Sequence, residues 1–325
     1  MTERVALATL PTPLERMPRL GKLLGVERLL VKRDDLTGLA FGGNKARKLE
    51  HLGAAALAAG CDTLVTGGGV QSNHARITSA AAARLSLDCH LVLDGLSPDR
   101  KTANVLLDHL FGATLHFTGS AHDYNELENE IERVGSALER SGRRPYVIPI
   151  GGASAPGVAA YADAAAELLE QLDAHAPDTI VLADGSGGTH AGLLAGLPAS
   201  TTVVGVDVGT RPELATVVAR LATEAASTTG RREPIGAVRI DRDFFGDGYG
   251  EMTPSGLEAL RLTAQLEGIA LDPVYTAKAM AGLIGRIRDD SIDPTGTIVF
   301  WHTGGSVALF ADRYAETLSA ETRRG

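Results

Sequence analysis

The sequence has few cysteines. Only Cys61 and Cys89 occur among its 325 residues, each in an apolar stretch with no second Cys or His at the spacing of metal ligands. This excludes a disulfide-stapled module and a zinc-finger site. It favours a reducing cytoplasm, and we expect no bound metal.

Positive charge is also scarce, with 31 Lys and Arg against 40 Asp and Glu and a formal net charge of −9. A chain with this balance does not attract nucleic acid or anionic lipid by bulk electrostatics. The sequence lacks an uninterrupted apolar run of about 18 residues, and acidic residues and prolines interrupt residues 1–20, where a signal peptide needs a continuous apolar core. We therefore expect a cytoplasmic protein without nucleic-acid or membrane partners.

Short apolar runs rich in Val, Ile and Leu alternate with longer segments of helical periodicity. This pattern is typical of strands buried between helices in a parallel sheet, and it predicts an α/β fold. The predicted strands are 63–66, 90–93, 115–117, 146–149, 179–183, 203–208 and 297–302. The predicted helices are 45–59, 74–85, 103–111, 124–140, 157–172, 189–197, 254–267, 275–288 and 306–318.

Glycine is the one residue in excess, at 38 of 325, and it gathers in turns that follow predicted strands. These turns are 67–76, 151–157, 184–192 and 302–306. In open α/β sheets, ligands bind beyond the carboxyl ends of the strands, where free helix N–H groups attract anions. Several such turns in one chain indicate a polar or anionic ligand.

The most informative turn contains Ser186, Gly187, Gly188 and Thr189, because its glycines allow backbone N–H groups to approach a phosphate and its hydroxyls add donors. The turn lacks the Gly-Lys-Ser/Thr ending of a nucleotide P-loop, and its G-x-G-x-x-G register is imperfect. A small phosphorylated cofactor is therefore favoured over ATP or a dinucleotide. Taken alone, a plain strand-to-helix turn remains the alternative.

Lys45 follows a pair of glycines and begins a predicted helix. The positive end of the helix dipole, together with Arg47 and Lys48, is expected to lower its pKa and favour a nucleophilic amine. On this motif alone, a solvated surface lysine is the alternative.

A second helix start combines Ser72, Asn73 and His74, whose hydroxyl, amide and imidazole meet free N–H groups. This grouping suits a carboxylate that needs oriented hydrogen bonds. Ordinary N-capping by Ser72 or Asn73 is the alternative.

Six motifs, taken together and in order, resemble the family of D-cysteine desulfhydrase and 1-aminocyclopropane-1-carboxylate (ACC) deaminase over nearly the whole chain. They read LPTPLERMPRL, KRDDLTGLAFGGNKARKLE, TGGGVQSNHAR, ADGSGGTHAGL, LDPVYTAKAMAGLI and FWHTGGSVALF. The resemblance implies a pyridoxal-phosphate enzyme of fold type II, similar to tryptophan synthase β, with two open twisted α/β lobes and the cofactor in the cleft. It implies a large lobe of residues 1–45 and 161–325, a small lobe of residues 46–160, and a homodimer.

The resemblance also implies which residues bind pyridoxal phosphate. Lys45 matches the lysine that carries the cofactor as a Schiff base and later moves the substrate α-proton. Asn73 matches the residue beside the hydroxyl of the cofactor ring, and Thr303 matches the residue that faces the pyridine nitrogen. The matching phosphate cup consists of Ser186, Gly187, Gly188 and Thr189.

The substrate, a small amino acid, is implied to contact a second set of residues. Ser72 and His74 match positions that hold its carboxylate, with Asn73 between them. Tyr249 and Tyr275 match two tyrosines whose phenols face it. The implied catalytic set is Lys45, Ser72, Tyr249 and Tyr275. Without the family, each tyrosine would be interpreted as a half-buried core aromatic.

The reaction is less closely defined. ACC deaminases have a glutamate and a glutamine where this chain has Thr276 and His74. A neutral hydroxyl opposite the ring nitrogen would not keep that nitrogen protonated, which suits β-elimination better than ring opening. We therefore expect β-elimination from D-cysteine to pyruvate, sulfide and ammonia.

Several alternatives stay open. Within the family they are ACC deaminase, L-cysteate sulfo-lyase, and a lyase for a related β-substituted amino acid in a biosynthetic pathway. Ile77 and Ala155 depart from the desulfhydrase pattern and could reshape the pocket. Outside the family they are a non-catalytic binder of pyridoxal phosphate or an amino acid, and a nucleotide-dependent oxidoreductase suggested by the glycine-rich turns alone.

Overall fold

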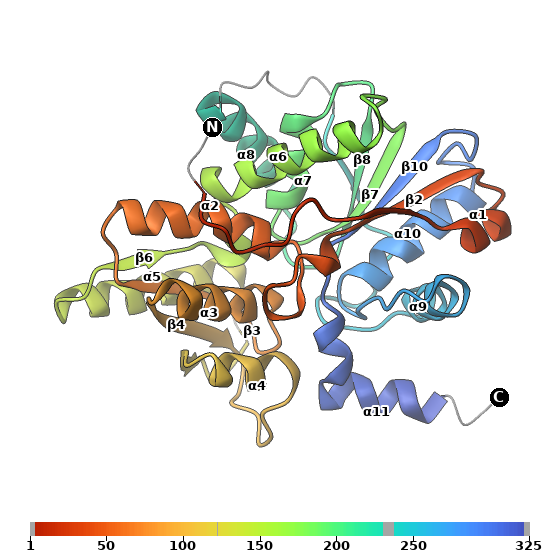
Figure 1. Ribbon diagram of the computed structural model, residues 1–325. Helices are drawn as coiled ribbons and strands as arrows, with labels where there is room; N and C mark the ends of the chain where they lie inside the picture. Colours follow the sequence, from red (N-terminus) through yellow and green to blue (C-terminus); the bar gives the residue numbers. More distant parts are fainter. Residues whose placement is uncertain (1–3, 122, 230–236, 322–325) are drawn as a thin grey trace.

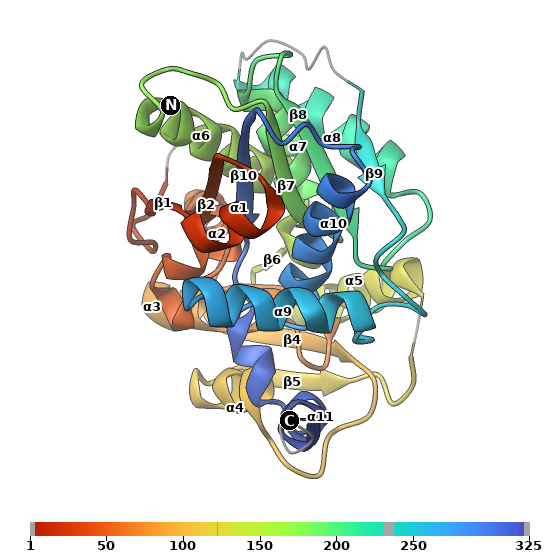
Figure 2. The same cartoon turned by 90° about the vertical axis from the view of Figure 1, so that its right-hand side faces the viewer.

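The computed structural model describes residues 4–121, 123–229 and 237–321 and places their strands in two sheets (Figure 1). One sheet has six strands in the order β1-β2-β10-β7-β8-β9, and the other has four in the order β5-β4-β3-β6. In Figure 1 and in the view turned by 90° (Figure 2), the six-stranded sheet lies above the four-stranded one. The expected α/β fold with two open lobes is confirmed.

The six-stranded sheet is parallel except for β1, which pairs antiparallel with β2. Its strands are β1 (Leu14–Arg16), β2 (Arg28–Arg33), β7 (Thr179–Asp184), β8 (Thr202–Asp207), β9 (Arg239–Asp241) and β10 (Thr297–His302). Helices α1 (Pro18–Leu24), α9 (Pro254–Glu267) and α10 (Thr276–Arg288) share one buried apolar cluster with it. Helices α6 (Ala155–Gln171), α7 (Gly188–Gly196) and α8 (Leu214–Thr229) share another on the opposite face. Because both faces are covered, its central strands are almost wholly apolar.

The four-stranded sheet is parallel throughout. Its strands are β3 (Thr63–Gly69), β4 (Asp88–Asp94), β5 (Thr114–Phe117) and β6 (Pro145–Val147). Helices α2 (Lys45–Ala58) and α3 (Asn73–Leu85) pack on one face and α5 (Tyr124–Arg140) on the other. The remaining elements are α4 (Ala103–Leu110), α11 (Asp312–Glu321), η1 (Asp34–Leu36), η2 (Leu39–Phe41), η3 (Ile150–Gly152) and η4 (Ser306–Phe310).

All seven predicted strands are present, with shifts of a few residues at their ends. The predicted helix 306–318 is wrong as a single helix, because Ala311 is extended and separates η4 from α11. Elements β1, β2, β9, α1 and α8 were not predicted. Strand β2 was missed because Lys32 interrupts its apolar run, although Lys32 is fully buried in the structure. Position 160, a predicted lobe boundary, lies inside α6, and the lobe ranges stay a prediction.

The carboxylate of Asp34, which begins η1 directly after β2, is fully buried and accepts hydrogen bonds from four parts of the chain. Arg47 Nε of α2 donates to it at 3.0 Å, and Trp301 Nε1 of β10 at 2.8 Å. Tyr161 Oη of α6 donates at 2.6 Å, and Thr12 Oγ1 of the N-terminal segment at 2.9 Å. Burial alone would raise the pKa of Asp34, but Arg47 and the hydrogen bonds together lower it. This carboxylate therefore fastens α2 to the six-stranded sheet.

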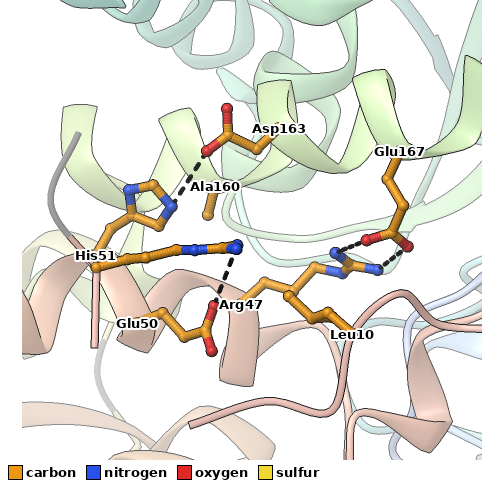
Figure 3. A pocket seen from close by; sticks show the side chains of 8 residues that line it. Leu10, Arg47, Glu50, His51, Ala160, Asp163 and Glu167 are labelled. Atoms are coloured by element: carbon orange, nitrogen blue, oxygen red, sulfur yellow. Dashed lines mark hydrogen bonds and ion pairs between the residues drawn. The ribbon is translucent and has the colours of Figure 1, made fainter. Parts of the chain in front are cut away.

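Arg47 also connects α2 to α6. Its two terminal nitrogens donate to Glu167 at 2.9 and 2.7 Å, and His51 pairs with Asp163 at 3.4 Å. Figure 3 shows these side chains facing one another across a cavity of about 30 Å³. A space of this size holds about one water molecule, so this is a structural contact between the helices and not a ligand site.

No helix in the described ranges combines the length and apolar content needed to span a bilayer.

Asp34→Asn is expected to lower the free energy of unfolding by about 3–5 kcal/mol at pH 7, because it leaves Arg47 buried without its full counter-charge. Denaturant unfolding of both proteins measures this. The pKa of Asp34 is lower in the folded protein than in the unfolded chain. The contribution of the Asp34 carboxylate to the free energy of unfolding is therefore complete above the pKa of the unfolded chain, and it is lost as the pH falls through the pKa of the folded protein. The difference between the two proteins should therefore narrow below about pH 4.

Asp289→Asn is the matched control, because Asp289 pairs with Arg286 at 2.9 Å near the surface. Asp289→Asn should lower the free energy of unfolding much less than Asp34→Asn does. Equal losses from the two substitutions would contradict the role assigned to Asp34.

Candidate active site

The glycine-rich turns converge on Lys45 from both sheets. A methyl group placed on Gly151, after β6, would lie 2.5 Å from Ser186 Oγ, after β7, and 3.8 Å from Lys45 Cε. A methyl group on Gly305, after β10, would lie 3.1 Å from Asn73 Nδ2 at the start of α3. Only glycine fits at these positions, so the close approach of the turns depends on it.

Lys45 is the first residue of α2 and lies partly buried in this space. Its Nζ donates to Asn44 Oδ1 at 3.1 Å, and Asn44 Nδ2 donates to Thr189 Oγ1 at 3.0 Å. Burial lowers the pKa of Lys45 to about 8, and the Asp184 carboxylate opposes the shift. The sequence argument attributed a lowered pKa of Lys45 to the helix dipole, Arg47 and Lys48, but Arg47 binds Asp34 and burial is the main cause. A lysine with this pKa carries a neutral, nucleophilic amine in part of the population at neutral pH.

The turn after β7 forms an anion cup at the start of α7. Gly187 adopts a left-handed backbone (φ 83°), and the helix has no side-chain cap. The first N–H groups of a helix have no partner within it, so Gly188 and Thr189 present theirs to a ligand. A methyl group on Gly188 would lie 2.7 Å from Lys48 Nζ, which places a buried amine directly beside the cup. This arrangement fits a phosphate.

Lys48 was considered in the sequence only as a neighbouring charge. It is fully buried, and its Nζ donates to the Gly151 carbonyl at 3.0 Å. Burial and the nearby Lys45 lower its pKa well below the ordinary lysine value. A phosphate dianion in the cup would offset that cost. The available signal was the three-residue spacing from Lys45, which puts both amines on one side of a helix.

The start of α3 lies beside the same turn, because a methyl group on Gly152 would lie 3.6 Å from His74 Cε1 and 3.5 Å from Lys48 Cδ. Ser72 is the N-cap residue, and its Oγ accepts from the Ala75 N–H at 3.2 Å. Asn73 Oδ1 accepts from Asn104 Nδ2 at 3.1 Å, which leaves the Asn73 amide nitrogen directed toward Gly305. Asn104 is a positioning residue that no sequence motif indicated.

His74 lies beneath the site and is only 3% exposed. Its Nε2 is 3.0 Å from Thr66 Oγ1, and the Thr66 hydroxyl donates to the Ile148 carbonyl at 2.7 Å. Thr66 has one proton, so it accepts from His74 Nε2–H. Burial, together with Lys45 and Lys48, lowers the pKa of His74, and the imidazole is neutral. Its predicted contact with a substrate carboxylate stays a prediction.

Tyr249 and Tyr275 form a pair at the edge of the site. Their hydroxyls are 2.6 Å apart, and their rings meet edge to face at 5.9 Å. The ring of Tyr249 lies against Gly69 and that of Tyr275 against Gly185, so the pair bridges the turns after β3 and β7. Burial raises the pKa of Tyr275 well above the ordinary tyrosine value, which keeps its phenol protonated.

The carboxylate nearest to Gly305 belongs to Asp272 and is fully engaged. A methyl group on Gly305 would lie 2.7 Å from Asp272 Oδ1, which accepts from Thr276 N at 2.8 Å and Thr276 Oγ1 at 2.7 Å. Thr303 is buried, and its carbonyl accepts from Asn44 N at 2.9 Å. The Asp272 carboxylate therefore accepts the N–H groups at the start of α10, and the Thr276 hydroxyl is bound to Asp272 and not free to face a ligand.

The donor set as a whole fits pyridoxal phosphate. The cup and Lys48 suit its phosphate, and Lys45 suits its aldehyde. The contacts of Asn73 and Thr303 with its ring stay predictions. In the described residues, no group of three or more His, Cys, Asp and Glu side chains is placed to hold a metal ion.

Comparisons with known proteins agree with this chemistry. Residues 5–304 match the protein family described as "Pyridoxal-phosphate dependent enzyme". A D-cysteine desulfhydrase of Klebsiella pneumoniae is 43% identical over 319 residues, covering 95% of this chain and 95% of that protein. A D-cysteine desulfhydrase of Salmonella typhi is 41% identical over 324 residues, with the same coverage of both.

Solved structures agree as well. A crystal structure of an ACC deaminase homologue has a TM-score of 0.89 and 38% identity, covering 98% of this chain and 96% of that one. Threonine deaminase isoform 2 from Solanum lycopersicum, at 17% identity and a TM-score of 0.69, shares the fold and covers 98% of this chain and 85% of its own.

Lys48→Met is expected to weaken the binding of pyridoxal phosphate by about 10–100-fold, because a charged donor to the phosphate is lost. Fluorescence titration of the cofactor-free protein measures the Kd. Pyridoxal, which has no phosphate, is the matched control ligand, and its Kd should stay the same. An equal loss for both ligands would contradict the assignment of Lys48 to the phosphate.

Proposed function

The chain belongs to the family of pyridoxal-phosphate-dependent enzymes, and on that premise we propose that it catalyses β-elimination from D-cysteine, giving pyruvate, sulfide and ammonia. The family resemblance inferred from the motifs is confirmed, and the chain is a pyridoxal-phosphate-dependent lyase. The observation that carries the proposal is the amine of Lys45, which lies between an anion cup and the start of α3. The similarity to two D-cysteine desulfhydrases over 95% of the chain supports the choice of substrate.

Proton removal is the proposed task of Lys45. When bound, pyridoxal phosphate supplies an electron sink that weakens the bond between the substrate α-carbon and its hydrogen. The Nζ of Lys45 takes that hydrogen as a proton. A pKa of about 8 suits this task, because the amine is deprotonated in part of the population and still basic enough to accept a proton.

Ser72 and Asn73 are proposed to hold the substrate carboxylate. The carboxylate gains the Ser72 hydroxyl, the Asn73 amide nitrogen and the positive end of the α3 dipole. Because Asn104 fixes the orientation of Asn73, the donor is positioned before the substrate arrives. His74 supports this turn from below through Thr66.

The tyrosine pair is proposed to protonate the departing sulfur. Two phenols that share one hydrogen bond use one of their two protons for it, so the other proton is available to the substrate. Since burial keeps the Tyr275 phenol protonated, it can donate a hydrogen bond to the departing sulfur and does not act as a base. Sulfide then leaves as a neutral or singly charged species.

The environment of Asp272 favours elimination over ring opening. Its carboxylate is occupied by the cap of α10, and Thr276 stands where ACC deaminases have a glutamate. The site therefore offers no free carboxylate from this segment to keep a ring nitrogen protonated. ACC, L-cysteate and other β-substituted amino acids are the competing substrates that the experiment below includes.

We also propose a cytoplasmic homodimer. Cys61 and Cys89 are unpaired, as suits a reducing compartment. Leu110 of α4 and Phe310 of η4 are 66% and 73% exposed, and their two elements pack against each other. Exposed apolar side chains gathered in this way are typical of a subunit interface.

Sulfide release is the experiment that tests the proposed function. Protein loaded with pyridoxal phosphate is given D-cysteine, L-cysteine, L-cysteate or ACC, and sulfide, sulfite, pyruvate and 2-oxobutyrate are measured. We expect sulfide and pyruvate from D-cysteine alone, with a loss of at least about 1000-fold in Lys45→Ala. Cofactor binding without sulfide from D-cysteine would contradict the proposal, and turnover of another substrate would redirect it.

The subunit arrangement has its own test. Light scattering after size exclusion should give twice the mass of one chain, and the combined Leu110→Ser and Phe310→Ser protein should shift toward the monomer. A wild-type monomer at micromolar concentration would contradict the dimer.

A further inference from the structure

Lys278 lies within the LDPVYTAKAMAGLI motif, but neither the sequence analysis nor the proposed mechanism gives it a role. It lies in the first turn of α10 and is fully buried. Its Nζ donates to the carbonyls of Phe245 and Gly248 at 2.9 Å each, and it is 3.5 Å from the carbonyl of Val208. A buried ammonium that binds backbone carbonyls fixes the segment to which they belong.

That segment carries one of the two active-site tyrosines. Residues 242–253 connect β9 to α9, and Tyr249 directly follows Gly248. The segment packs against the end of β8, because a methyl group on Gly209 would lie 3.0 Å from both Gly248 C and Tyr249 N. Lys278 and Gly209 therefore hold the backbone beside Tyr249.

The same turn of α10 fixes the other tyrosine. Tyr275 is the N-cap residue of α10, and its N–H donates to Asp272 Oδ2 at 2.9 Å. Lys278 lies three residues further along and reaches the segment of Tyr249. The first turn of α10 thus fixes the backbone at both tyrosines, whose hydroxyl oxygens are 2.6 Å apart.

Nearby carboxylates support the charge on Lys278. Burial lowers its pKa to about 8, while Asp272, Glu251 and Asp207 oppose the shift. Since hydrogen bonds of an ionised donor are stronger than neutral ones, the charged form is the better anchor for two carbonyls.

We propose that Lys278 is a positioning residue of the reaction, which holds the Tyr249 hydroxyl within hydrogen-bond distance of Tyr275 by anchoring the carbonyls of Phe245 and Gly248. The proposal rests on the proposed function for its effect on turnover. Its effect on the structure of residues 242–253 does not depend on which substrate is used.

The experiment compares Lys278→Met, Tyr249→Phe and the double variant, all as holoenzymes. Lys22→Met, at an exposed lysine of α1, is the matched control. Hydrogen exchange measured by mass spectrometry reports on the peptide that covers 242–253, with a peptide from α2 as internal reference. Sulfide release from D-cysteine gives kcat and KM.

We expect faster exchange in the 242–253 peptide of Lys278→Met, unchanged exchange in α2, and a fall in kcat of about 10-fold or more. If Lys278 acts through Tyr249, adding Lys278→Met to the Tyr249→Phe protein should lower kcat by less than about 3-fold. If Lys278 had a purely structural role, Lys278→Met would lower kcat by the same factor in the wild type and in Tyr249→Phe.

Unchanged exchange in the 242–253 peptide, or an equal factor in both backgrounds, would overturn the proposal. If Lys278→Met does not fold, Lys278→Gln, which keeps a neutral donor, replaces it with smaller effects in the same directions. If the wild-type enzyme releases no sulfide, the proposed function fails, and the exchange measurement still decides whether Lys278 anchors the segment.

Discussion

The position of Lys45 depends on one buried carboxylate, that of Asp34. Lys45 begins α2, and two residues further on Arg47 binds Asp34, which directly follows β2. Asp34 also accepts from Trp301 and Tyr161, so the same carboxylate joins α2 to β10 and α6. Because α6 follows the turn that faces the anion cup, this network fixes the amine relative to the cup. The geometry of the active site is thus set by an ion pair outside it.

The site places two amines close together, and the protein alone compensates their charged forms only in part. Lys45 and Lys48 are one helical turn apart, and burial lowers the pKa of both. Asp184 opposes these shifts, but its carboxylate already accepts from Gly187 N and lies beside His190. A phosphate beside Lys48 would relieve this cost, so the burial that lowers the pKa of Lys45 also favours a phosphate ligand.

Part of the candidate site could be proposed from backbone chemistry, because glycines, hydroxyls and helix starts recur after buried strands. That pattern indicated Lys45, Ser72 and the 186–189 turn as candidates, and the family resemblance implied their roles. The roles of Lys48, Asn104 and Lys278 could not be predicted from the sequence, because they depend on the direction in which each side chain points once distant segments have packed together. Arg47 was misassigned for the same reason: its partners Asp34 and Glu167 are remote in sequence. Strand β2 was not predicted because it contains Lys32. In the sequence, a lysine indicates a surface position, and only the structure shows that Lys32 is buried against Glu167.

The claim on which the account rests is that Lys45, and no other buried lysine, bonds to the cofactor. Borohydride reduction of the holoenzyme, followed by peptide mapping by mass spectrometry, tests it directly. The account predicts the reduced pyridoxyl phosphate group on Lys45 alone. A label on Lys48 or Lys278 would contradict it.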